Sequence, residues 1–525
     1  MMTHLRYWSP VAALLATFGA SVVLPAWPEK WSQAVLVFLL LPLAWSLHYV
    51  VRSPWQWRSP QVWLWGALSL SLVQSAFVPN PYAGIVGWLS LFVFALVVTV
   101  SQSLTLEHRL PLLWGILALC VATVGMSLLP MWVALPWQWV PPVGQSALSL
   151  AAISLPGLVS ADMLLRSAKR WQQILATVGL VACLLPLLRP ALPVAVRDAW
   201  QAQAQQRAAI QRLVQARPLG VGFGQYATVY PRFATVLTFQ PQHAPSSVVE
   251  YGLGLGALPS LAWFGFCIFA LTSVWKASGW HRWIFSCGII FLLGFGSVAP
   301  VLQWPGALVG LGMLFGLGMQ PLQTQETSGP STRRWLRRAL LAVVLLFAAW
   351  SVGLAVAARA YVTAERLHRT GEDKLAAQQY QRALRLDPDP GKRWQYADML
   401  WLLEHRTGQL AEAQHQAQLA TAWNQDSSQA WQIEARIAYT QGEFGTAERL
   451  YQDAIRRNPF FSLDLYFNLA DVYKKQGKVT DERAILEEAL GRYPASPTAA
   501  DVANLFILEQ FQRLRDRLIA LSKQG

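Results

Sequence analysis

The chain has 525 residues, of which 54% are hydrophobic and only 13% are charged, and its mean hydropathy is +0.31. A soluble globular protein carries about twice this share of charged residues, so the composition excludes an ordinary soluble domain and indicates an integral membrane protein. The 26 tryptophans agree with this class, because the indole ring favours the membrane–water interface. The net charge of +14 does not indicate nucleic-acid binding, since Lys and Arg mark the cytoplasmic loops of membrane proteins.

Runs of about 20 apolar residues, which are long enough to cross a bilayer as a helix, predict about eleven transmembrane helices. The expected spans cover residues 9–26, 32–50, 61–78, 84–103, 110–128, 146–165, 172–188, 253–275, 283–301, 303–319 and 339–357. The first span is interpreted as retained, because no small-residue cleavage site follows it. If the N-terminus is cytoplasmic, alternate connections carry the clusters of Lys and Arg, whereas the opposite short connections carry little charge besides Lys30. This orientation puts residues 189–252, and everything after the last span, outside the cytoplasm.

The four cysteines all lie in apolar runs and are interpreted as small buried hydrophobic residues. No Cys or His spacing typical of a metal site or of a disulfide framework is present. We therefore expect no metal and no cofactor.

Residues 189–252 form the longest segment between spans, and they are rich in arginine on the side where the charge rule predicts few. The candidates for anion binding are Arg189, Arg207, Arg212, Arg217 and Arg232. The planar guanidinium group matches phosphate oxygens, and the abundant phosphates outside the cytoplasm belong to lipids, including polyprenyl diphosphate carriers. The alternative is an amphipathic helix over residues 197–216 that lies on the membrane, with its arginines reaching lipid headgroups.

A glycine segment, PLGVGFG, contains Gly220, Gly222 and Gly224 and precedes His243. It follows a polar helical stretch and lacks the Lys and Ser/Thr of a nucleotide-binding loop. We expect its glycines to let the backbone turn and approach a ligand or a neighbouring helix. His243 is the best candidate for a general base, because an unperturbed imidazole titrates near neutral pH. The alternative for His243 is a structural hydrogen-bonding role.

The C-terminal tail is polar, and it contains glycines that recur at intervals of 37, 34 and 35 residues, namely Gly371, Gly408, Gly442 and Gly477. The positions that lie five, nine, twelve and seventeen residues after these glycines are Ala376, Tyr380, Ala383 and Pro388; Ala413, Ala417, Ala420 and Gln425; Ala447, Tyr451, Ala454 and Pro459; and Glu482, Leu486, Ala489 and Pro494. This pattern resembles the tetratricopeptide repeat, a helix pair that stacks into a solenoid and binds peptides or proteins. The alternative is a scaffold that caps or dimerises the membrane domain.

The predicted fold class is therefore all-α, a polytopic membrane protein followed by an α-solenoid. Four parts are expected, which are the first seven spans in residues 1–188, a large loop in residues 189–252, four further spans in residues 253–358, and the repeat domain in residues 359–525.

The segment around the glycines resembles the motifs of the O-antigen ligase superfamily, which includes O-antigen ligases, polysaccharide polymerases and bacterial O-oligosaccharyltransferases. The matching positions are Pro218, Leu219, Gly220, Gly222 and Gly224, then His243, and then Glu250, Tyr251 and Gly252 at the start of a span. The motifs cover about 35 residues, and the many-span topology extends the similarity over roughly 1–357. Some members of the superfamily also have a tetratricopeptide tail.

The resemblance implies transfer of a glycan from undecaprenyl diphosphate to an acceptor hydroxyl on the periplasmic face of a bacterial inner membrane, with inversion and without a metal. It implies that His243 activates the acceptor, that the arginines stabilise the leaving diphosphate, and that the glycines and Glu250 shape the loop. The acceptor could be lipid A core, a growing polysaccharide or a protein hydroxyl. A protein partner on the repeats is also possible.

Two positions depart from the superfamily pattern. Many relatives carry an S-R-G at the outer end of a span before the loop, whereas this chain has Gln145 and Ser146 in GQSALSL. Where relatives have an Arg and a Trp before the glycine segment, this chain has Gln203 and Arg207. The missing arginine keeps open a non-enzymatic alternative, an envelope scaffold that acts through its repeats, beside the polysaccharide polymerase alternative.

Overall fold

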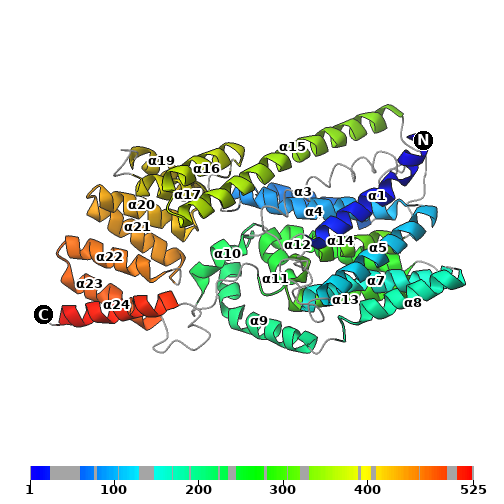
Figure 1. Cartoon of the computed structure of the whole chain (residues 1–525), viewed down its shortest axis with the longest axis horizontal. Helices are drawn as coiled ribbons and strands as arrows, with labels where there is room; N and C mark the ends of the chain where they lie inside the picture. Colours follow the sequence, from blue (N-terminus) through cyan, green and yellow to red (C-terminus); the bar gives the residue numbers. More distant parts are fainter. Residues whose placement is uncertain are drawn as a thin grey trace. The chain divides into compact units, whose positions relative to one another are not determined.

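The computed structural model describes residues 2–23, 60–75, 78, 80–104, 106–128, 147–167, 169–188, 191–222, 225–234, 244–276, 281–303, 305–319, 330–387, 389, 392–403, 410–459, 462–492 and 505–522. All regular secondary structure in these ranges is helical, which confirms the all-α prediction (Figure 1). The chain forms two compact units. The N-terminal unit comprises residues 1–206, 217–224 and 243–356, and the repeat unit comprises residues 207–216, 225–242 and 357–525.

The helices of the N-terminal unit are mostly apolar. They are α1 (Met2–Val23), α3 (Pro60–Ser75), α4 (Pro81–Gln102), α5 (Leu106–Leu128), α7 (Ala147–Ser167), α8 (Arg170–Leu184), α11 (Ser247–Leu255), α12 (Ala257–Trp275), α13 (His281–Val298), the 3-10 turn η4 (Val301–Gln303) and α14 (Pro305–Gly318). The boundary between the units falls within α9 (Ala191–Ala216) and within α15 (Pro330–Arg369).

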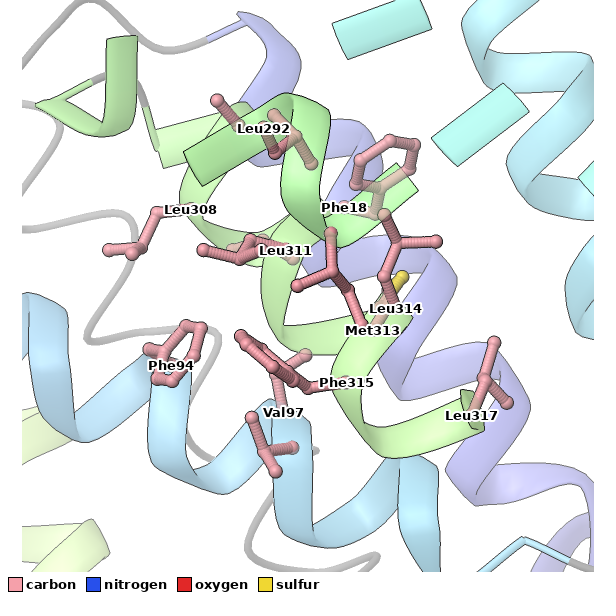
Figure 2. Packing of buried hydrophobic residues seen from close by; sticks show 14 of the residues in the cluster. Phe18, Phe94, Val97, Leu292, Leu308, Leu311, Met313, Leu314, Phe315 and Leu317 are labelled. Atoms are coloured by element: carbon pink, nitrogen blue, oxygen red, sulfur yellow. The ribbon is translucent and has the colours of Figure 1, made fainter. Parts of the chain in front are cut away.

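Helix α14 forms the centre of the N-terminal unit, because every one of its residues is buried. It packs against α1, α4, α7 and α13. Figure 2 shows Leu311 and Phe315 of α14 beside Phe94 and Val97 of α4. The glycines of α14 allow this close approach, since a side chain at Gly316 would meet the carbonyl oxygen of Val98 at 2.6 Å. The apolar core therefore rests on helix–helix packing that excludes larger residues from one face of α14.

Three helices in the described part of the chain are long and apolar enough to cross a membrane, within Glu107–Val124, Ala257–Trp275 and His281–Val298. The expected number of about eleven is therefore wrong for the described residues. For three of the expected spans the physical reason is length, because α3, α8 and α14 have 16, 15 and 14 residues. At about 1.5 Å per residue they reach only about 21–24 Å, which is less than the roughly 30 Å of a bilayer core. The expected span at residues 32–50 lies outside the described residues.

Helix α8 nevertheless presents an apolar face to the outside. Trp171, Ile174, Val178 and Val181 follow one another at helical spacing and are each more than half exposed. A continuous apolar surface of this kind marks a contact with lipid or with a partner. It agrees with the composition, which indicates a membrane protein.

The repeat unit consists of paired helices. After the end of α15 they are α16 (Asp373–Leu386), α17 (Arg393–Leu402), α19 (Leu410–Trp423), α20 (Ser428–Thr440), α21 (Phe444–Arg457), α22 (Leu463–Lys475), α23 (Val479–Arg492) and α24 (Leu505–Ser522). Two short elements of the preceding loop belong to the same unit, α10 (Tyr226–Val229) and the 3-10 helix η3 (Tyr230–Phe233).

The predicted repeat pattern is confirmed by its glycines and its small buried residues. Gly371, Gly442 and Gly477 follow the first helix of their pairs and have φ values of +79°, +80° and +75°, where glycine is favoured. Gly408 lies outside the described residues. The repeated alanines have no exposed surface, and they are Ala376, Ala383, Ala413, Ala417, Ala420, Ala447, Ala454 and Ala489. Their small size lets the paired helices approach each other closely.

The last helix pair departs from this pattern at Glu482, which replaces the alanine found at the equivalent position of the other three copies. The Glu482 carboxylate is buried and lies 2.7 Å from the guanidinium group of Arg517 in α24. Arg517 also contacts Asp471 of α22 at 2.7 Å. Helix α24 therefore covers the last helix pair, and its Arg517 neutralises the buried charge of Glu482.

Candidate functional site

The residues predicted to form the site are only partly described. His243, Arg189 and Gly224 lie outside the described residues. Arg217, Gly220, Gly222 and Glu250 belong to the N-terminal unit, whereas Arg207, Arg212 and Arg232 belong to the repeat unit.

The glycine segment contacts the C-terminal end of α11. Gly220 and Gly222 have φ values of +92° and +94°, in the region that favours glycine. The amide of Val221 donates a hydrogen bond of 2.8 Å to the carbonyl oxygen of Leu253. A side chain at Gly220 would meet the amide nitrogen of Gly256 and the Leu253 oxygen, each at 2.7 Å. These two contacts require glycine at position 220, because the two backbones touch directly.

A side chain from another helix covers this contact. The Gln74 amide group, from the last turn of α3, donates to the carbonyl oxygen of Leu219 and lies 3.5 Å from that of Gly254. Gly256 also has a positive φ of +69° and lies against Leu219. The turn is therefore fixed by α3 on one side and by α11 on the other.

The residues directly after His243 are fixed to the N-terminal end of the same helix. The buried Glu250 carboxylate accepts a hydrogen bond of 2.8 Å from the Ala244 amide. Ser246 is the N-cap of α11, and its hydroxyl accepts from the Val249 amide. The first helical residue, Ser247, accepts a hydrogen bond of 2.9 Å from the Leu302 amide through its hydroxyl. Helix α11 therefore holds the residues that directly follow His243 in the sequence.

The loop arginines in the described residues have different surroundings. Arg207 and Arg212 are exposed on α9, five residues apart, so they leave the helix axis about 140° apart at 100° per residue. Arg217 directly follows the C-terminus of α9, where a cation is favourable beside the partial negative charge of the helix dipole. Arg207 and Arg212 thus remain accessible to an anionic ligand.

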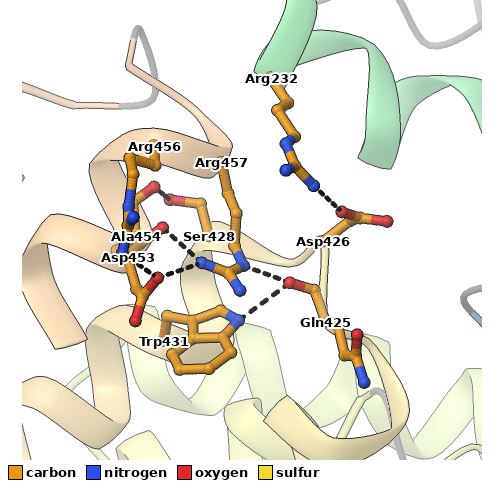
Figure 3. A network of polar contacts seen from close by, with 9 residues as sticks. All are labelled: Arg232, Gln425, Asp426, Ser428, Trp431, Asp453, Ala454, Arg456 and Arg457. Atoms are coloured by element: carbon orange, nitrogen blue, oxygen red, sulfur yellow. Dashed lines mark hydrogen bonds and ion pairs between the residues drawn. The ribbon is translucent and has the colours of Figure 1, made fainter. Parts of the chain in front are cut away.

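Arg232 has a partner within the protein. Its guanidinium group lies 3.5 Å from the Asp426 carboxylate, which is only 3% exposed and sits between α19 and α20 (Figure 3). This contact joins residues that are 194 positions apart in the sequence. Asp426 was not among the predicted site residues. Its neighbour Gln425 stands where the other three copies have proline, and this departure is the signal in the sequence that could have drawn attention to the turn.

The described residues contain no group of three or more His, Cys, Asp or Glu side chains that could hold a metal ion. The N-terminal unit offers a hydrogen-bonded backbone around α11, and a histidine stands directly before Ala244 in the sequence. The repeat unit separately carries the exposed guanidinium groups of Arg207 and Arg212. Guanidinium groups bind and neutralise phosphate oxygens, and a histidine can accept a proton.

The comparisons with known proteins match the C-terminal region. The tetratricopeptide repeat family matches residues 402–460 and again residues 434–497. No curated protein shows significant similarity to the chain. The repeats are thus established by the family match, by their glycines and by their buried alanines.

Proposed function

We propose that this protein transfers a glycan from a polyprenyl diphosphate carrier to an acceptor hydroxyl in the manner of the O-antigen ligase superfamily. The proposal includes a location in a bacterial inner membrane, with residues 189–252 and the repeat unit on the periplasmic side. The acceptor is lipid A core or a protein, and a growing polysaccharide is the alternative within the same chemistry.

One observation carries this proposal. The glycine segment and the residue that follows His243 in the sequence both bond one short helix, α11. The glycine segment bonds its C-terminal end through Val221, the residue after His243 bonds its first turns through Ala244, and the helix itself carries the Glu250-Tyr251-Gly252 motif. The bonded backbone of the residues that directly follow His243 in the sequence supports this proposal, because general-base catalysis needs a positioned side chain.

The proposed reaction moves one proton and one glycosyl group. His243 accepts the proton of the acceptor hydroxyl while the acceptor oxygen forms a bond to the anomeric carbon. The bond between that carbon and the phosphate oxygen breaks, and the diphosphate leaves with the electron pair. Arg207 or Arg212 is the proposed partner of the diphosphate, where a positive charge would stabilise the negative charge that develops on it. The anomeric configuration inverts in a single displacement.

A purified-protein assay tests this proposal. Detergent-solubilised protein is mixed with carrier-linked glycan and an acceptor, and transfer is followed for the wild type, His243→Ala and His415→Ala. The third variant is the matched control, because His415 is an exposed histidine on α19. Loss of general-base assistance should lower the rate of His243→Ala by about 10²–10⁴-fold. Transfer by folded His243→Ala at the wild-type rate would overturn the proposal.

A second candidate function is a non-enzymatic envelope scaffold. It is favoured by the tetratricopeptide match and by the absence of arginine at the GQSALSL segment. The same assay separates the two functions, because a scaffold would show no transfer in the wild type while a pull-down through the repeat unit would still recover envelope proteins.

A further inference from the structure

The repeat unit contains a segment that comes from the loop. Residues 225–234 include α10 and η3, and they cluster with the repeats rather than with the glycine segment that precedes them. Tyr226, Val229 and Tyr230 are at most 3% exposed, and the two tyrosine rings stack with centroids 4.9 Å apart. Helix η3 packs against α21 of the third helix pair. Residues 225–234 will be called the docked segment.

The surface that receives the docked segment is rigid. The Gln425 carbonyl oxygen, in the turn between α19 and α20, accepts hydrogen bonds from the Trp431 indole at 3.0 Å and from Arg457 of α21 (Figure 3). The Arg457 guanidinium group lies over the Trp431 ring at 4.0 Å and bonds Asp453 at 2.9 Å. The turn that carries Asp426 is thereby braced to α21, the same helix that η3 contacts.

The ion pair between Arg232 and Asp426 sets the register of the docked segment. Asp426 is almost fully buried, whereas the Arg232 side chain is about half exposed. An ion pair with one exposed member contributes little to stability, but it fixes which residue meets which. The buried tyrosines and Val229 hold the segment in place through apolar burial. The docked segment ends nine residues before His243 in the sequence.

We propose that the repeat unit binds residues 225–234 of its own loop as an intramolecular peptide ligand, with Arg232 and Asp426 as positioning residues for the loop that leads to His243 in the sequence. This inference rests on the proposed function for its effect on transfer, although the docking itself does not. It assigns Arg232 to positioning instead of to diphosphate binding. It also couples the loop to the repeats, because a partner that bound the repeats at the turn between α19 and α20 would compete with the docked segment.

Crosslinking tests the docking without any activity. Exposed Cys287 is first replaced by serine, and the remaining three cysteines are buried. Arg232→Cys and Asp426→Cys are then combined and treated in membranes with a short bis-maleimide. A specific protease site inserted between residues 320 and 329 reveals the crosslink, because crosslinked halves stay together on a denaturing gel. The matched control pairs Arg232→Cys with a cysteine at exposed Lys374 of α16, in the first helix pair.

Crosslinking of the 232–426 pair but not of the 232–374 pair is the expected result. Failure of the 232–426 pair to crosslink, or equal crosslinking of both pairs, would overturn the docking whatever the protein does. The untreated double-cysteine protein lacks the ion pair and should transfer slowly, as Arg232→Gln does. Crosslinking should raise its rate toward that of the wild type, because the crosslink restores the contact. Loss of transfer on crosslinking would show that the contact must open, which contradicts positioning.

Kinetics of single substitutions test the role of Arg232. Arg232→Gln should lower kcat about fivefold to twentyfold and leave the KM for the donor unchanged, because misplacement affects chemistry and not donor binding. Arg232→Lys keeps the charge and should restore most of the rate. A diphosphate-binding role predicts instead a raised donor KM and loss in both variants, since lysine lacks the bidentate fork. Arg382→Gln, which removes an exposed arginine of α16, is the control that should behave as wild type.

Discussion

Two close contacts at α11 depend on single residues. Gly220 lies where a side chain would overlap the backbone of Gly256 and Leu253, and the Ala244 amide depends on the buried carboxylate of Glu250. Neither contact involves a flexible surface group, so small changes at these positions should be costly. Both sit within the motif segments on which the proposed function rests.

Gly220→Ala should destabilise the protein. A residue with a side chain at a φ of +92° is strained, and the added methyl group would also press on backbone atoms, for a cost of about 1–3 kcal/mol. Gly252→Ala is the matched control, because Gly252 lies within α11 and a side chain there would meet nothing within 4 Å. Thermal unfolding of both variants in detergent provides the measurement. Equal midpoints for the two variants would contradict the close contact at Gly220.

Glu250→Ala should leave the buried Ala244 amide without its acceptor, at a cost of about 1–3 kcal/mol. Glu250→Gln keeps an acceptor oxygen and should cost less. We expect transfer to fall in the same order, because the residue after His243 is less firmly held. Removal of an exposed carboxylate, Glu487→Ala in α23, serves as the control. A Glu250→Gln variant that is as damaged as Glu250→Ala would argue for a role of the charge itself.

At the scale of helices, the solenoid closes on α24 through Arg517. The equivalent of Glu482 is alanine in the other three copies, so the buried carboxylate and the arginine depend on each other. The last helix pair therefore keeps the packing of the repeat but replaces an apolar contact by an ion pair. The buried Glu482 carboxylate can therefore be paired only by a helix that carries a cation, as α24 does with Arg517.

Arg517→Met should leave Glu482 buried without its cation and destabilise the last pair by about 1–3 kcal/mol, since Arg517 is partly exposed and water screens some of the loss. The double variant Glu482→Ala with Arg517→Met should recover most of the stability, because it restores the alanine of the other copies. Urea unfolding followed by protease sensitivity of the repeats measures both. A double variant that is less stable than Arg517→Met would refute the paired role. Arg513→Met, on an exposed face of α24, is the control.

Alkaline pH should weaken the first helix pair. Burial, together with the nearby Glu365 and Asp398, raises the pKa of Tyr380 from 10.0 to about 12. A group with a raised pKa in the folded state contributes stability below its unfolded pKa, and this contribution is lost as the pH rises through the folded value. Unfolding should therefore become easier between pH 10 and 12. Tyr380→Phe should remove this part of the pH dependence of unfolding. The difference in tyrosinate absorbance between the wild type and the variant reports the ionisation of Tyr380.

Deprotonation of Lys392 should also make the repeat unit less stable at alkaline pH. Burial alone would lower the pKa of Lys392, but Asp389 and Asp387 more than offset it and raise the pKa above 10.5. Its ion pairs, at 3.2 Å and 2.8 Å, are therefore kept below pH 10.5 and lost as the pH rises further. Lys392→Met should destabilise the junction between the first and second helix pairs already at neutral pH, because two buried carboxylates lose their cation. Circular dichroism measured against pH distinguishes the loss of helix in the variant at neutral pH from the loss in the wild type at alkaline pH.

At the scale of the whole molecule, the positive charge is confined to one part of the chain. Residues 357–525 contain 22 basic and 22 acidic side chains, so the net charge of +14 belongs to residues 1–356, with 20 basic and 6 acidic side chains. A neutral repeat unit favours partners that are recognised by shape and hydrogen bonds. A positively charged remainder favours anionic lipids and phosphates.

The sequence predicts features that depend on neighbours along the chain. The length of one helix pair sets the spacing of the repeat glycines and alanines. Gly371, Gly442 and Gly477 could therefore be assigned from their intervals. Contacts between distant residues are not encoded in this way, and the partner of Arg232 lies 194 positions away. The number of spans was overestimated because hydropathy counts apolar residues but does not fix where a helix ends, as α14 shows with 14 residues.

The orientation of the chain can be tested by a fusion. A reporter that is active only in the cytoplasm, placed after Gly525, should remain inactive if the repeat unit is periplasmic. The same reporter fused near the N-terminus should be active and provides the control. An active C-terminal fusion would contradict the orientation and would put residues 189–252 on the wrong side for a polyprenyl diphosphate donor.

The central claim is that this protein consumes a carrier-linked glycan, and the most direct measurement is the pool of glycan on polyprenyl diphosphate in a strain that lacks the gene. The account predicts that the pool rises, that the wild-type gene returns it to normal, and that His243→Ala does not, although the variant protein is present in the membrane. His415→Ala should restore the pool fully. An unchanged pool in the deletion strain, or full restoration by His243→Ala, would contradict glycan transfer and leave the repeats as the functional part of the molecule.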